Sequence, residues 1–144
     1  MWQRPQTFYF AVATALLCAM AFGDVATVYA EGASDPIPYM AKLPYAVLII
    51  LAATANLLAT FCWGHRGLQM RLGVGSAVVL AGLQTWLAVD YFSAADGIVF
   101  RFTAIFPLVA LFFGILAVRG VWADELLVRS SSRLRSARNR KVKK

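Results

Sequence analysis

Charged residues are scarce in this 144-residue chain, at 15% of the total, whereas a soluble domain has about 25%. Hydrophobic residues make up 60%, and the mean hydropathy is +0.67. A chain of 15.8 kDa cannot hide so much apolar surface inside one globule, because too much of so small a body is surface. The composition excludes a soluble enzyme and a disordered protein, and it leaves an integral membrane protein.

Residues of the types that act in catalysis or bind metals are equally scarce. The chain has two cysteines, Cys18 and Cys62, and one histidine, His65. These three residues form no Cys-x-x-Cys pair and no set with the spacing of metal ligands. No catalytic triad, glycine-rich phosphate loop or carboxylate pair is present either. We therefore expect no enzymatic activity, no metal and no cofactor.

Long apolar stretches dominate what remains. A helix crosses the hydrocarbon core in about 20 apolar residues, and continuous runs of this length are typical of helices rather than barrel strands. The predicted spans cover about residues 8–28, 44–63, 72–91 and 102–118, and residues 24–43 form the longest connection. The predicted fold class is all-α: an integral membrane four-helix bundle over residues 1–118, in which Pro107 kinks the fourth helix.

The basic residues are unevenly distributed about these spans. Twelve of the 14 lysines and arginines fall on the side that holds both termini and the turn at residues 64–71. The other side holds Lys42 and Arg101 together with five of the seven acidic residues. The positive-inside rule therefore predicts that both termini are cytoplasmic. An alternative interpretation of residues 1–30 is a cleaved signal peptide, with Arg4 as its basic region.

Small residues recur at four-residue spacing in every predicted span. Helices in lipid associate through close packing of small residues and through interhelical hydrogen bonds, so we expect these faces to form the helix contacts. The stripes are Ala11, Ala15, Ala19 and Gly23 in the first span, Ala55 and Ala59 in the second, Gly73, Ala77, Ala81 and Thr85 in the third, and Ala110 and Gly114 in the fourth.

Asn56 and Gln84 are the most polar side chains at depth, and two interpretations of them are open. The favoured one is that each amide holds helices together by bonding to a backbone carbonyl or to a nearby threonine such as Thr54 or Thr60. The other is a polar pocket or translocation path. Apart from Asp24 and Asp90, at which the first and third apolar runs stop, no Asp, Glu, Lys, Arg or His lies within a predicted span, which argues against a proton-coupled pump.

Aromatic residues gather near the predicted span ends, as in the belt that fixes the height of a helix in the membrane. They are Trp2, Tyr9, Tyr39, Tyr45, Trp63, Tyr91 and Trp122.

Residues 119–144 form a second region, which is expected to be a basic amphipathic helix to about Arg135 followed by a disordered end. The favoured binding partner of its positive charge is the anionic lipid headgroups, and the second candidate is a cytoplasmic or membrane-protein partner. Nucleic acid is the weakest alternative, because no RNA-binding motif accompanies the basic residues. A homo-oligomer is also compatible with the sequence.

Both ends of the chain resemble a family of small four-span membrane proteins from Bacteroidota, catalogued as domain-of-unknown-function family 4293. The opening Met1–Tyr9 (MWQRPQTFY) is similar to its M-x-Q-R-x-Q-T-x-Y pattern, and Ile115–Ala117 with Asp124–Ser130 and Arg133–Arg135 are similar to its I-L-A … D-E-x-L-V-R-S-x-D-R-L-R ending. This chain departs at Ala123, where lysine is usual, and at Ser132, where aspartate is usual. The resemblance implies a bacterial inner-membrane location and leaves the activity open.

The two terminal signatures suggest a function. We expect Gln3, Arg4 and Gln6 to hydrogen-bond with Asp124, Glu125 and Arg129, and this cytoplasmic interaction face to include Arg133 and Arg135. The alternative for these residues is that each extends to the headgroups separately. The predicted function is a non-catalytic accessory or scaffold subunit of the inner membrane that is recognised through this face. The alternative function is a small transporter or a lipid- or quinone-binding protein with a polar cleft near Asn56 and Gln84.

Overall fold

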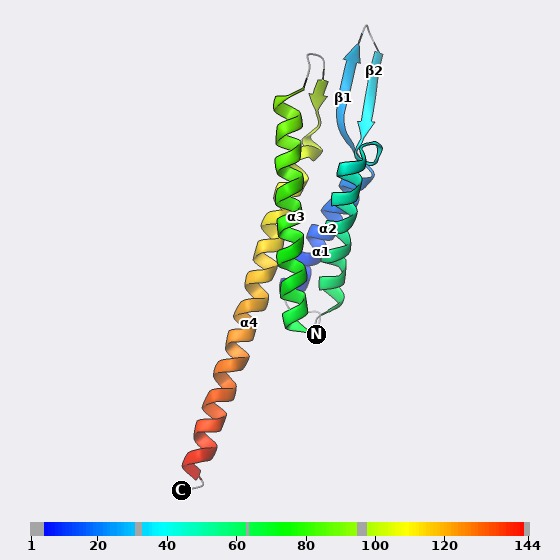
Figure 1. Ribbon diagram of the computed structural model, residues 1–144. Coiled ribbons are helices and arrows are strands. Elements are labelled where there is room, and N and C mark those ends of the chain that lie inside the picture. Colours follow the sequence, from blue (N-terminus) through cyan, green and yellow to red (C-terminus); the bar gives the residue numbers. More distant parts are fainter. Residues whose placement is uncertain (1–4, 31–32, 63, 95–97, 143–144) are drawn as a thin grey trace.

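The computed structural model describes residues 5–30, 33–62, 64–94 and 98–142, and the side chains of residues 7–29, 34–62, 64–94 and 98–130. Four helices pack side by side, and a small sheet extends from one end of them (Figure 1). The helices are α1 (Pro5–Ala21), α2 (Leu43–Phe61), α3 (Arg66–Phe92) and α4 (Phe106–Val142). The strands are β1 (Asp24–Ala30), β2 (Ala33–Pro38) and β3 (Ile98–Phe100), and the short 3-10 helices are η1 (Tyr39–Ala41) and η2 (Phe102–Ile105).

Three helical segments of the described chain are long and apolar enough to cross a membrane. They are Leu43–Phe61, Arg66–Phe92 and Phe102–Ser130, and they make this chain a membrane protein. The fourth predicted span corresponds to α1, whose 17 residues give a length of about 25 Å at the usual helical rise, at the short end of what a span requires. A membrane crossing by α1 therefore stays a prediction.

The sheet corrects the all-α fold class and the predicted extension of the first span to Val28. Residues 24–30 and 33–38, expected to be span end and loop, form the antiparallel pair β1 and β2, and β3 pairs with the other edge of β1. The run Val25–Tyr29 contains the β-branched and aromatic residues that strands favour. Pro36 and Pro38 are tolerated because β2 is an edge strand, where proline need not donate to a neighbour.

The small-residue stripes predicted the wrong contact face for α1 and part of α3. Ala11, Ala15 and Ala19 are exposed, and the buried face of α1 is formed instead by Phe10, Ala13, Leu17 and Met20. In α3 Gly73 is buried, whereas Ala81 and Thr85 are exposed. The prediction is confirmed for Ala59, Ala110 and Gly114, which are buried. The larger apolar side chains face inward because they fill more of the space between helices.

Gly73 marks a close approach of three helices. A Cβ atom at this position would lie 2.5 Å from Cγ2 of Val118 in α4 and 2.9 Å from Cζ of Phe10 in α1. Phe10 is fully buried and packs with Ala117 and Val121. The three residues 10, 73 and 118 therefore lie at one level, which sets the relative heights of α1, α3 and α4.

Helix α4 continues without a break from Phe106 to Val142 and extends beyond the other helices (Figure 1). The predicted kink at Pro107 is wrong, because Pro107 is the second residue of α4. In the first turn of a helix the missing N–H of proline has no intrahelical partner to lose. The helix also runs past Arg135, where its end was predicted, through residues that were expected to be disordered. Its 37 residues correspond to a length of about 55 Å.

Candidate functional site

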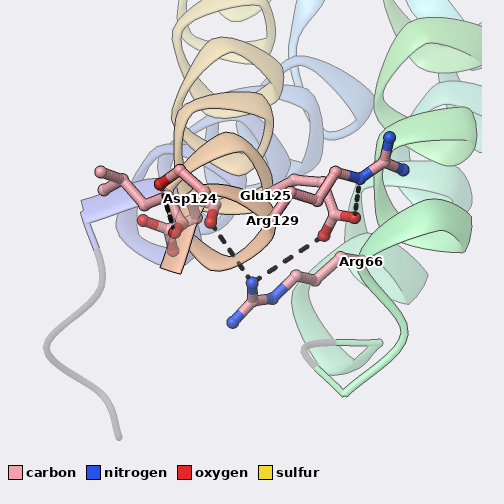
Figure 2. Close-up of polar contacts among 6 residues, drawn as sticks. Arg66, Asp124, Glu125 and Arg129 are labelled. Atoms are coloured by element: carbon pink, nitrogen blue, oxygen red, sulfur yellow. Dashed lines mark hydrogen bonds and ion pairs between the residues drawn. The ribbon is translucent and has the colours of Figure 1, made fainter. Parts of the chain in front are cut away.

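A group of charged residues joins the turn between α2 and α3 to the lower part of α4; we call Arg66, Asp124, Glu125 and Arg129 the Arg66 cluster (Figure 2). Arg66 Nη1 lies 3.9 Å from Glu125 Oε2 and donates to the backbone carbonyl of Asp124 at 3.4 Å. Arg129 Nε donates to Glu125 Oε1 at 2.9 Å from one turn along the same helix. The Glu125 carboxylate is therefore shared between two arginines from two helices.

The Arg66 cluster contributes little to the stability of the fold, and its main effect is on the direction of α4. The side chains of Arg66 and Glu125 are 24% and 27% exposed, and that of Arg129 is 71% exposed. Ion pairs with this much access to solvent contribute about 0.2–1 kcal/mol. The bridge spans 59 positions of sequence, however, so it ties the emerging part of α4 to the α2–α3 turn and restricts the direction in which α4 leaves.

The cluster brings together three of the predicted face residues. Asp124, Glu125 and Arg129 lie on one segment of α4, as expected. In the sequence Arg66 is one of the basic residues of the turn at residues 64–71, and no local pattern links it to Glu125. Its position at the first residue of α3, beside the turn, was the one available signal.

The remaining predicted face residues are not tested by the structure. Gln3 and Arg4 lie outside the described residues, and the side chains of Gln6, Arg133 and Arg135 lie outside the described side chains. The backbone of Gln6 is in α1, one turn before Phe10. Because Phe10 is level with Val118 and α1 runs antiparallel to α4, this turn of α1 is at about the level of residue 122.

Among the described residues, the Asn56 amide and Gln84 Oε1 have no hydrogen-bond partner of the kind that the favoured interpretation predicts. Asn56 is fully buried, and neither its amide nitrogen nor its amide oxygen has a partner among the described residues. Thr54 and Thr60 donate to backbone carbonyls of α2 itself, at Ile50 and Asn56. Gln84 Oε1 is likewise buried without a partner in the described part of the chain.

Two further buried polar side chains were missed in the sequence, Gln69 and Ser76. Both are 1% exposed and lie on the inner face of α3 with an unpaired polar atom among the described residues, Nε2 of Gln69 and Oγ of Ser76. Polar residues near a turn or among small residues give no sequence signal of burial. Together with Asn56, Gln69 and Ser76 are polar side chains in a core that consists mainly of apolar ones.

A second polar group lies at the opposite end of the helices; we call Asp24, Lys42, Tyr45, Asp90 and Arg101 the sheet-end layer. Asp90 accepts from the Lys42 ammonium at 3.1 Å and from the Tyr45 hydroxyl, and Arg101 Nη1 lies 3.5 Å from Asp24 Oδ2. These contacts join α2 to α3 and β1 to the segment before η2.

Two tyrosines expected in the aromatic belt belong instead to the interior beside this layer. Tyr39 and Tyr45 are both fully buried and their rings contact edge to face, with centroids 6.0 Å apart. Burial raises the pKa of the Tyr39 hydroxyl, against a smaller opposing effect of its hydrogen bond to Thr103. The neutral hydroxyl donates to Thr103, which in turn donates to the backbone carbonyl of Asp24 at 2.8 Å.

The two charged ends bracket an apolar zone of membrane thickness. Between Arg71 and Asp90, α3 contains no Asp, Glu, Lys, Arg or His, and this segment is about 28 Å long at 1.5 Å per residue. A bilayer core is about 30 Å thick. The length of the uncharged segment between the Arg66 cluster and the sheet-end layer therefore matches the thickness of a bilayer core.

Within the described residues there is no group of three or more His, Cys, Asp and Glu that could hold a metal ion. Cys18 and Cys62 are both free thiols.

Comparison with known proteins supplies a family. Residues 2–134 match the family described as Domain of unknown function (DUF4293). This chain belongs to that family. The match covers nearly all of the DUF4293 chain, including all but one residue of each terminal signature, and confirms the resemblance seen in the sequence. No curated protein and no solved structure showed significant similarity to this DUF4293 protein.

Proposed function

We propose that this DUF4293 protein is a non-catalytic accessory or scaffold subunit of the bacterial inner membrane. In this proposal both termini are cytoplasmic, all four helices cross the bilayer, and a partner recognises the face formed by the Arg66 cluster and the outer part of α4. The observation that carries the proposal is the unbroken α4, which extends beyond the other helices with its base tied to Arg66 (Figure 1, Figure 2).

The chemistry of the emerging part of α4 supports a protein partner. Leu126 and Leu127 are 50% and 68% exposed, beyond the level at which the other helices end. Basic residues follow them along the helix, from Arg129 to Lys141. A helix with exposed leucines beside arginines fits an acidic surface that contains an apolar groove.

The expected interaction face adds Gln3, Arg4 and Gln6 to this surface. The level of the first turn of α1, close to residue 122 of α4, supports their inclusion. A double-mutant cycle of Arg4→Ala and Asp124→Ala tests this part, with partner binding as the readout. We expect a coupling of about 1 kcal/mol, and strictly additive effects would remove the amino-terminal residues from the face.

Site-specific photo-crosslinking tests the main proposal in the bacterium that makes the protein. The full-length tagged chain carries the photoreactive residue at Leu127, and a matched chain carries it at Val99, which is 55% exposed in β3 at the opposite end. We expect a discrete protein adduct from position 127 only. Adducts with lipid alone, or the same adducts from both positions, would contradict the proposal.

Two sets of variants show whether the adduct depends on the face. Reversing Arg133 and Arg135 to glutamate should abolish the adduct, because the partner surface is expected to be acidic. Arg66→Ala should weaken it several-fold by releasing the base of α4, whereas Arg66→Lys keeps the charge and should retain most of it. An adduct that survives all of these substitutions would contradict recognition through this face.

A second candidate function, binding of a lipid or quinone, is favoured by one observation. Gln84 lines a cavity of about 340 Å³ together with Tyr91, Phe100, Arg101 and Phe102, and its Oε1 has no partner among the described residues. Asn56 does not line this cavity. Mass spectrometry of lipid extracts from the purified protein tests the candidate: a quinone enriched with the wild type should be lost from Gln84→Leu.

A further inference from the structure

A long apolar groove lies between α3 and α4, and it shares no lining residue with the Arg66 cluster or with the cavity at Gln84. Its volume is about 650 Å³, and its walls include Val74, Ala77 and Ala81 of α3 and Leu111 and Ile115 of α4. The groove exists because small residues stand on α3 where larger ones would fill the space. Ala81 is exposed and Ala77 half-buried, so the groove opens to the outside of the protein.

Two side chains at one end of the groove differ from the rest. Arg119 is the one charged residue in its lining, and Trp122 lies beside it one turn along α4. Arg119 is exposed, and the ion pairs of the described residues at this end use Arg66 and Arg129 rather than Arg119. A cation and an indole N–H are therefore available where the apolar walls end.

The positions of Arg119 and Trp122 along α4 indicate the shape of a ligand that would fit the groove. Arg119 lies about 9 Å inside the level of Glu125 along α4, just within the apolar zone. Between Trp122 at one end and Leu111 at the other, the groove is about 16 Å long along the helix axis. A ligand that fills it has an extended apolar chain and an anionic group at the end that is nearer to the membrane surface.

We propose that the α3–α4 groove binds one acyl chain of an anionic phospholipid, with its phosphate held by Arg119 and by the indole N–H of Trp122. Basic pockets between transmembrane helices recognise anionic headgroups in this way. The arginine adds a charge-assisted hydrogen bond to the apolar contact of the chain, so headgroup charge contributes to selectivity. This inference goes beyond the proposed function, because it concerns a lipid-facing surface that the partner face does not use.

Native mass spectrometry of the purified full-length protein tests the proposal. The protein in mild detergent is exposed to phosphatidylglycerol or to phosphatidylcholine of the same acyl chains at equal concentration. We expect the wild type to retain one phosphatidylglycerol molecule in preference to phosphatidylcholine. Arg119→Gln should reduce this preference by about tenfold.

The chain offers a closely matched control for the charge. Arg71 lies on α3 at nearly the same depth as Arg119, because residues 73 and 118 are level, but it does not line the groove. Arg71→Gln should leave lipid retention unchanged. If Arg71→Gln and Arg119→Gln reduce it equally, the effect is one of general surface charge and the proposed site is wrong.

Substitutions that fill the groove test the proposed contact between its apolar walls and the acyl chain. Ala77→Leu should reduce retention of both lipids, and Ala81→Leu at the exposed edge should do the same without affecting buried packing. Unchanged lipid binding in both variants would overturn the proposal. It would also be overturned if disulfide cross-linking of Val78→Cys joins two copies at the groove, because the occupant would then be a second chain.

Discussion

Adding one methyl group at Gly73 tests the three-helix contact on which the relative heights of α1, α3 and α4 depend. The Cβ atom of alanine would meet Val118 Cγ2 at 2.5 Å and the Phe10 ring at 2.9 and 3.1 Å. Real Cβ contacts essentially never fall below 3.0 Å, and the Phe10 ring is fully buried, so the Val118 and Phe10 side chains or the helices that hold them must shift.

The control is Gly75→Ala, two residues further along α3. Gly75 is exposed, and a Cβ there meets nothing within 4 Å. Replacing glycine by alanine in a helix contributes about 1 kcal/mol of stability at either position, and this gain cancels when the two variants are compared. The difference that remains is the overpacking cost, about 1–3 kcal/mol. Gly73→Ala should be less stable than Gly75→Ala by that amount.

The measurement is reversible unfolding in mixed micelles by titration with sodium dodecyl sulfate. A second variant, Val118→Ala, removes the atom that the new Cβ would approach most closely. In that background Gly73→Ala should cost less, although the contact with Phe10 keeps the rescue partial. Equal stability of Gly73→Ala and Gly75→Ala, or a cycle with Val118→Ala that shows no coupling, would refute the three-helix contact.

Other contacts give three more predictions. Asn56→Leu removes a buried amide that has no partner in the described structure, so it should be about 1–3 kcal/mol more stable than wild type in the same titration; a loss of stability would mean that the amide is bonded. Asp90→Ala and Tyr45→Phe should show a coupling of about 1 kcal/mol in a double-mutant cycle, and additivity would contradict their hydrogen bond. In a chain whose native cysteines are replaced, a membrane-impermeant maleimide added outside the cell should label Ser34→Cys but not Gly64→Cys. Labelling of both from the same side would contradict the arrangement of the two polar ends on opposite membrane surfaces.

Hydrophobic runs made the helices predictable. The second and third predicted spans, 44–63 and 72–91, largely coincide with α2 and α3, because an apolar run without charge is a local property of the chain. The family was also recognisable, because its signatures consist of contiguous residues at the two ends. Both successes depend on information that lies within about 20 neighbouring positions.

The failures depend on residues that are distant in sequence. Small residues at four-residue spacing are compatible with any helix face, and the outward position of Ala15 follows from the fit of Leu17 and Phe10 against α2, α3 and α4. For the same reason the sequence could not show that the Asn56 amide and Gln69 Nε2 are buried without a hydrogen-bond partner in the described part of the chain. Burial of a polar side chain depends on which helix stands opposite.

The amino-acid sequence alone determined that the chain enters a membrane as helices and ends in a strongly basic segment, because hydrophobicity and charge act residue by residue. Only the tertiary structure decided that β1 would pair with β3 some 70 residues later, since strand pairing needs a partner edge. It also decided that Arg66 would reach across to Glu125 and that a groove lined by Arg119 would open between α3 and α4. Each of these features arises from two segments that meet only when the helices pack.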